Sequence, residues 1–64
     1  MIWIPLDNDN RPIPRTKILF WHKIQKTFYA GIYHGIDWTI GFENLYDEEV
    51  FAQYSHFMYV GPPK

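Results

Sequence analysis

The chain has 64 residues and no cysteine, and this combination limits how it can be stabilised. Small domains commonly supplement a thin core with disulfides, a bound metal or a partner subunit. Without cysteine, disulfides and thiolate metal sites are both excluded. Aromatic residues make up 20% of the sequence, and each one buries about 150–250 Å². We therefore predict a single domain over residues 1–64 with a core built largely from aromatic rings.

The overall composition excludes two further classes of protein. Apolar residues make up 47% of the chain and charged residues 20%, which is too hydrophobic for a disordered polypeptide. The longest apolar run is far shorter than the roughly 18 residues of a membrane span, and the opening Met1 to Pro5 lacks the regions of a signal peptide. We expect a folded cytoplasmic protein with no membrane partner.

Alternating hydrophobicity predicts a mainly β fold. Residues 26–34 show the period of two clearly, with Phe28, Ala30 and Ile32 on one face. Residues 16–23 are apolar at four consecutive central positions, which predicts a strand covered on both faces. A short extended segment is expected at residues 3–6, and further strands at 38–42 and 51–60. We predict a small antiparallel sheet or barrel of about four strands.

Two details of this prediction concern the second half of the chain. Trp38, Ile40 and Phe42 should share one face of their strand, whereas the buried face of residues 51–60 stays open. Residues 43–51 break the alternation, because two apolar pairs flank three acids. Asn44 or Asp47 could cap a single helical turn there, with a loop as the alternative. At most one short helix is therefore expected.

The sequence carries no recognisable catalytic motif. Its glycines are scattered and form neither a GxGxxG nor a GxxxxGK[ST] frame. Ser55 and His56 are the only adjacent nucleophile and base, and neighbours on a strand point to opposite faces. A domain of this size also has little room for a pocket that excludes water. We predict that the protein is not an enzyme.

Because the chain has no cysteine, its three histidines are the candidate nitrogen ligands for a metal. His22, His34 and His56 lie on three different predicted strands, so they could converge on one metal with an acidic fourth ligand. Their separations match no zinc signature, and a single histidine in a strand is more often structural. We predict no metal and no cofactor, and we leave open whether the three histidines meet.

The distribution of charge suggests a protein-binding surface. Residues 27–63 contain no Lys or Arg but carry the acidic run Asp47-Glu48-Glu49. Aromatic anchors beside charged groups are typical of binding patches, although a solvated loop is the plainer interpretation. The residues predicted to bind a basic partner surface are Tyr46, Asp47, Glu48, Glu49 and Tyr54.

Two other functions remain as alternatives. Basic and aromatic residues interleave between residues 17 and 29, as in modules that bind single-stranded nucleic acid. The residues of this alternative are Lys17, Trp21, Lys23, Lys26 and Tyr29. A pI of about 6.2 opposes a general nucleic-acid binder, and rings such as Trp21 and Phe28 also suit the core. The other alternative is a structural homodimer, because exposed sheet edges and surplus aromatic area favour pairing.

Short segments along most of the chain carry a family resemblance. They are Trp3-Ile4-Pro5-Leu6, Pro12-Ile13-Pro14, Ile18-Leu19-Phe20, Ala30-Gly31-Ile32-Tyr33, Trp38 and residues 55–63, SHFMYVGPP. With these the chain resembles a family of small phage and prophage proteins, the domain-of-unknown-function 551 family. The resemblance implies a small β-rich fold and a phage origin. It leads us to expect an accessory protein that binds a host protein, and inhibits a defence or nucleic-acid-processing complex by covering a basic surface.

Overall fold

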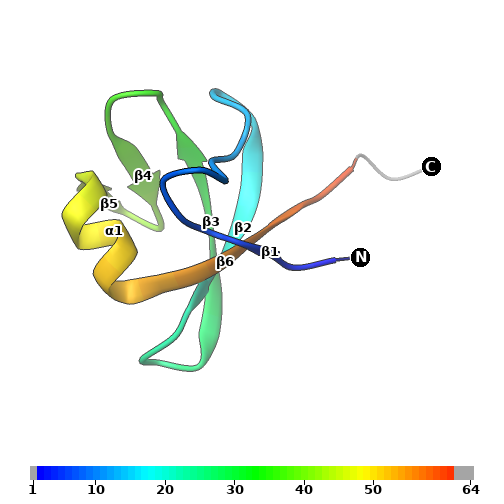
Figure 1. Cartoon of the computed structure of the whole chain (residues 1–64), viewed down its shortest axis with the longest axis vertical. Helices are drawn as coiled ribbons and strands as arrows, with labels where there is room; N and C mark the ends of the chain where they lie inside the picture. Colours follow the sequence, from blue (N-terminus) through cyan, green and yellow to red (C-terminus); the bar gives the residue numbers. More distant parts are fainter. Residues whose placement is uncertain (1, 62–64) are drawn as a thin grey trace.

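The computed structural model describes residues 2–61 and shows one antiparallel sheet with one short helix (Figure 1). The elements are β1 (Ile4–Pro5), β2 (Lys17–His22), β3 (Thr27–Tyr33), β4 (Trp38–Ile40), β5 (Glu43–Leu45), α1 (Asp47–Gln53) and β6 (Tyr54–Tyr59). The six strands lie in the order β1-β6-β2-β3-β4-β5. Within residues 2–61, α1 is too short to cross a membrane.

The path of the chain explains this strand order. Strands β2 to β5 form a meander, and after α1 the chain returns so that β6 pairs with the free side of β2. Strand β1 then pairs with the other side of β6. The predicted mainly β fold with one short helix is confirmed, although the sheet has six strands rather than about four. The two edge strands are β1, which lies within the extended segment predicted at residues 3–6, and β5, which was not predicted as a strand. Both are short, which limits edge-to-edge association.

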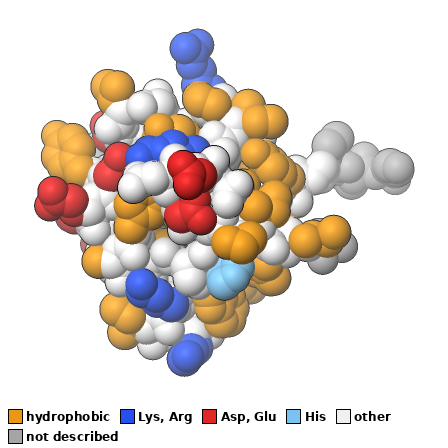
Figure 2. Space-filling model, viewed as in Figure 1, with side chains coloured by type: hydrophobic (Ala, Val, Ile, Leu, Met, Phe, Trp, Pro, Cys, Tyr) orange, Lys and Arg blue, Asp and Glu red, His pale blue; other side chains and the backbone are white. Residues whose placement is uncertain are grey.

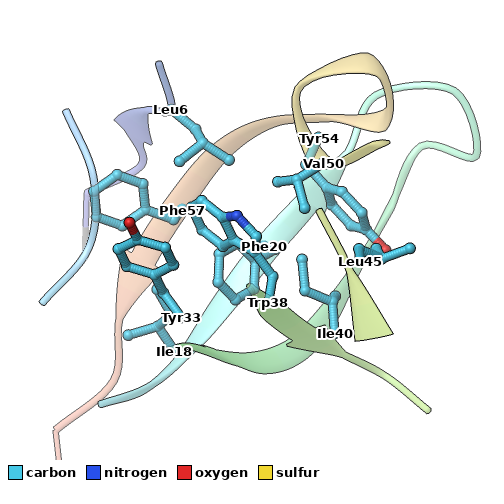
Figure 3. Packing of buried hydrophobic residues seen from close by; sticks show 10 residues of the cluster. All are labelled: Leu6, Ile18, Phe20, Tyr33, Trp38, Ile40, Leu45, Val50, Tyr54 and Phe57. Carbon is cyan, nitrogen blue, oxygen red and sulfur yellow. The ribbon is translucent and has the colours of Figure 1, made fainter. Parts of the chain in front are cut away.

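The core, half of whose residues are aromatic, lies on one side of the sheet (Figure 3). Phe20 and Trp38 are fully buried, and their rings meet edge to face at 5.8 Å. Helix α1 covers one end of the core through Val50, which is fully buried, and Phe51, which packs on Trp38 at 6.1 Å. The core residues are Leu6, Ile18, Phe20, Tyr33, Trp38, Ile40, Leu45, Val50, Tyr54 and Phe57. Perpendicular ring pairs of this kind contribute beyond their buried area.

A tight turn ends β4 two residues earlier than the sequence pattern predicts. Ile40 pairs with Glu43, so Gly41 and Phe42 form a two-residue turn. Gly41 has a φ of 64°, which places glycine at the first turn position as in a type II′ hairpin. The prediction that Phe42 shares the buried face of Trp38 and Ile40 is wrong, because Phe42 projects from the turn into solvent.

Strand β2 is covered completely on only one face. Its inward side chains Ile18, Phe20 and His22 are buried, whereas Leu19 and Trp21 on the other face are half-buried. Phe28, which pairs with Trp21 across the sheet, is 54% exposed. The prediction of a strand covered on both faces is therefore wrong, and so is the interpretation of Phe28 as a core residue.

A bulge in β6 determines which of its side chains face the core. His56 pairs with Trp21 whereas Tyr54 pairs with His22, so Ser55 is an extra residue opposite β2. Such an insertion reverses the alternation of faces. Tyr54 and Phe57 both point inward as a result, although their spacing places them on opposite faces of a regular strand. Residues 51–53, which were predicted to begin this strand, are the end of α1.

Candidate functional site

Asp47 is held in a network that joins the N-terminal loop to the start of α1. Its carboxylate accepts hydrogen bonds from Arg11 Nη2 at 2.8 Å and from the buried indole Nε1 of Trp38 at 2.8 Å. Arg11 also lies over the ring of Phe51, 5.3 Å from its centroid. The hydrogen bond from Arg11, and then the one from Trp38, lower the pKa of Asp47. Asp47 was predicted to bind a partner, but its carboxylate is already bonded to Arg11 and Trp38.

Three of the predicted partner-binding residues do lie together in solvent, at the first turn of α1. Tyr46 is 70% exposed, and Glu48 and Glu49 are exposed beside it. Glu49 Oε1 also accepts a hydrogen bond from the backbone N–H of Tyr46 at 3.3 Å, which caps the helix. Tyr46 rather than Asn44 or Asp47 occupies the N-cap position. We call Tyr46, Glu48 and Glu49 the acidic surface.

Tyr54 does not belong to that surface. Its side chain is 5% exposed, and its ring packs edge to face on Phe20 at 6.1 Å and on His22 at 4.9 Å. Figure 3 shows it beside Val50 at one end of the core. Burial raises the pKa of the Tyr54 phenol. Its predicted role as an exposed anchor is corrected, because the bulge at Ser55 turns the side chain inward.

The five residues of the nucleic-acid alternative do not share one surface. Lys17 and Trp21 lie on the outward face of the sheet, whereas Tyr29 pairs with the buried Phe20 on the inward face. Lys23 Nζ donates a hydrogen bond to the backbone oxygen of Phe51 at 3.1 Å, on the helix side. Lys26 is exposed in the turn between β2 and β3, with a φ of 59°. Trp21 is thus the only aromatic residue of this set on the outward face.

Trp21 instead lies among apolar neighbours on the outward side of β1, β6, β2 and β3. Trp3 packs on Trp21 edge to face at 5.9 Å, and Phe28 is its cross-strand partner. Leu19 lies between Ala30 and Met58 in the next row. We call this surface the outer sheet face, and it consists of Trp3, Leu19, Trp21, Phe28, Ala30, Ile32, His56 and Met58. None of these residues is Lys, Arg, Asp or Glu.

The outer sheet face has shallow hollows at both ends. One, of about 280 Å³, is lined by Trp3, Trp21 and His56. The other, of about 190 Å³, is lined by Lys17, Ile18, Leu19, Ala30 and Val60. Elsewhere on the molecule charge is more frequent. In the view of Figure 2 the acidic side chains lie toward the left and centre, and hydrophobic side chains gather on the right, where the termini leave. The alternation of β3 placed Phe28, Ala30 and Ile32 together, but gave no indication that their face is the outward one.

The three histidines are separate. His22 is buried, and its Nδ1 accepts the backbone N–H of Gln25 at 3.1 Å while Nε2 lies 3.3 Å from Oε1 of Gln53. His34 contacts Thr39, and His56 contacts Ser55. Among residues 2–61, no three His, Asp or Glu side chains are placed to hold a metal ion. The histidines therefore do not converge.

A polar pocket of about 290 Å³ opens beside the β4–β5 turn, and the sequence did not predict it. Its lining residues are His22, Gln25, Tyr29, Ile40, Gly41, Phe42, Glu43, Gln53 and Tyr54. They come from five strands, helix α1 and two turns, which only the folded sheet brings together. The alternation of β3 and the Gly41-Phe42 dipeptide were the available signals, but neither indicates a pocket by itself.

In comparisons with known proteins, no family model, curated protein or solved structure matches the chain. The resemblance to phage proteins therefore stays a prediction. Pro62 and Pro63, which close the segment that resembles that family, lie outside the described residues.

Proposed function

We propose that the protein is a non-catalytic module that binds another protein through its outer sheet face. An antiparallel sheet with one solvated face normally presents polar side chains there. This sheet presents Leu19, Trp21 and Phe28 instead. A contiguous apolar surface of this kind is the mark of an interaction site, and it is the observation that carries the proposal.

The chemistry of the face favours a protein over nucleic acid. Aromatic residues and Met are enriched at the centres of protein interfaces, where charged residues are depleted, and Trp is among the commonest energetic anchors. Trp3, Trp21 and Phe28 match this composition. The aliphatic side chains around Leu19 have no group that binds a phosphate. Lys17 is the basic residue beside them. The resemblance to phage proteins supports a host protein as the partner, with inhibition by occlusion as the effect.

The acidic surface is a second place at which a partner could bind. Tyr46 is 70% exposed beside two exposed carboxylates, so it suits a basic partner surface such as one that holds nucleic acid. Single-stranded nucleic acid on the outer sheet face is the remaining alternative, because Trp3, Trp21 and Phe28 offer rings on which bases could stack.

A pull-down from lysate of the native host, with one variant of each surface, separates these proposals. Phe28→Asp places a charge in the outer sheet face at an exposed position, and Glu48→Lys with Glu49→Lys reverses the acidic surface. We expect one stoichiometric protein partner that is lost with Phe28→Asp and kept with the double variant. Circular dichroism checks that both variants fold.

The opposite pattern would move the interface to the acidic surface. Recovery of nucleic acid, with binding that weakens steeply as salt is raised, would replace the protein partner by the stacking alternative.

A further inference from the structure

The polar pocket combines aromatic walls with a carboxylate, and it lies away from both surfaces discussed above. Tyr29 from β3 forms one side, and Phe42 from the β4–β5 turn lies at the rim with its ring exposed to solvent. Glu43 follows Phe42 and also lines the pocket. Its floor contains His22 and Tyr54, which are each 5% exposed. The rings of Tyr29 and Tyr54 pack edge to face on each other, with centroids 6.5 Å apart.

Both ring nitrogens of His22 are engaged within the floor. Gln25 donates its backbone N–H to Nδ1 at 3.1 Å, and Nε2 lies 3.3 Å from Oε1 of Gln53.

The remaining polar groups make the pocket electronegative. Glu43, the acidic residue among those that line the pocket, comes from β5. Burial, then the nearby Tyr29 and Glu43, raise the pKa of the Tyr54 phenol. The hydroxyl of Tyr29 donates to Oε1 of Gln25. None of the described residues that line the pocket is Lys or Arg. A ligand that fits this field carries positive charge.

We propose that the polar pocket binds a small organic ammonium group, and binds it best when the nitrogen is methylated. Aromatic faces attract such cations through the ring quadrupole, and a nearby carboxylate adds Coulomb attraction. The volume of about 290 Å³ is at the small end of ligand sites, which suits a head group rather than a large molecule. The group could belong to a free metabolite or to the end of a methylated lysine side chain.

An NMR titration with three probes tests the proposal on the intact chain. The probes are choline, Nε-trimethyllysine and the neutral isostere of choline in which a tert-butyl group replaces trimethylammonium. We expect a cation to shift the backbone signals of Gly41, Phe42 and Gln53 while the indole signals of Trp3 and Trp21 stay in place. Stronger binding of choline identifies a free cation as the ligand, and stronger binding of trimethyllysine identifies a lysine side chain. Equal binding of the neutral isostere, or binding of neither cation, overturns the proposal.

Two exposed positions provide variants that should not affect folding. Phe42→Ala removes the exposed ring at the rim of the pocket, and the energy of an exposed cation–π contact predicts a loss of affinity of roughly two- to fivefold. Glu43→Gln keeps the shape and removes the charge, so binding of the cation should weaken and become less sensitive to salt. Phe28→Ala removes an exposed ring on the other face of the sheet and should leave the affinity unchanged. Unchanged affinity in both pocket variants would place the cation elsewhere.

Discussion

The carboxylate of Asp47 joins parts of the chain that share no strand pairing. Its Oδ1 accepts a hydrogen bond from the indole N–H of Trp38, whose side chain is fully buried. Its Oδ2 accepts a hydrogen bond from Nη2 of Arg11 in the N-terminal loop. The Arg11 and Asp47 side chains are 26% and 44% exposed, so solvent weakens their attraction. The bond to Trp38 is the more important one, because a buried donor without a partner is costly.

Truncation of Asp47 should therefore cost more than loss of its ion pair. We expect Asp47→Ala to lower the free energy of unfolding by about 1–3 kcal/mol, because it leaves Trp38 Nε1 without an acceptor. Arg11→Gln should cost less than about 1 kcal/mol, as is usual for exposed ion pairs. Urea denaturation followed by Trp fluorescence measures both. A larger loss in Arg11→Gln would contradict this ranking.

The same carboxylate should make stability depend on acid pH. The pKa of Asp47 is lower in the folded state than the ordinary 3.8, so the unfolded chain binds the proton more readily. Its contribution is present above the ordinary value and is lost as pH falls through the folded value. Asp7, whose pKa is lowered by the N–H groups of Asn10 and Asp9, acts in the same direction. The melting temperature should fall from about pH 5 to pH 2, and less steeply in Asp47→Asn; equal slopes would assign the dependence to other groups.

Gly31 has a packing role that its φ angle does not show. A Cβ at this position would lie 2.4 Å from the backbone oxygen of Thr39 and 3.0 Å from the ring of Phe20. The first contact is with backbone, which has little freedom to move. Gly31→Ala should therefore cost about 3 kcal/mol or more, at the upper end for overpacking. A thermal melt within a few degrees of the parent protein would show that β4 can shift instead.

At the scale of elements, the strands with full alternation were predictable and the irregular ones were not. Residues 16–23 and 26–34 contain β2 and β3, because several side chains on each follow the period of two. The β4–β5 hairpin was missed, because Ile40 and Phe42 continue the alternation through the turn. The inward position of Tyr54 was missed as well, because the bulge at Ser55 depends on pairing with β2. The acidic surface was predictable because its residues are neighbours in the sequence. The outer sheet face and the polar pocket were not, because strand pairing brings their residues together.

The β4–β5 turn can be tested against the uninterrupted strand that the alternation suggested. Gly41 has a φ of 64°, so Gly41→Ala should lower stability by roughly 1–2 kcal/mol. Phe42 is exposed at the tip, so Phe42→Ser should stay within about 0.5 kcal/mol of the parent. Chemical denaturation of the two variants provides the comparison. A large loss in Phe42→Ser would mean that this ring is buried.

At the scale of the whole molecule, the two sides of the sheet differ in how completely they are covered. The inward side is covered by α1 through Val50 and Phe51, whereas on the outward side Trp3 packs on Trp21 near one edge of the sheet. The described molecule is small, with a radius of gyration of 10.8 Å. Small domains leave a high fraction of their surface exposed, and apolar area there tends to associate.

Weak self-association should follow from this imbalance. Light scattering at several concentrations should show a monomer that forms dimers as concentration rises, and Phe28→Asp should shift the equilibrium to monomer. The Glu48→Lys and Glu49→Lys variant should behave like the parent. Dimers that persist in Phe28→Asp would indicate pairing through an edge strand, β1 or β5.

The pairing of β2 with β6 also determines when this chain can fold during synthesis. Ile18 pairs with Tyr59 and Phe20 with Phe57, so β2 waits for a strand that is made much later. Until β6 has left the ribosome, Phe20 has only one of its two strand neighbours and the hydrophobic interior stays open to solvent. The sheet therefore cannot close while only its first strands have been synthesised. A fragment that stops after α1 would leave β1 and β2 without a common partner, and cellular proteases should degrade it quickly.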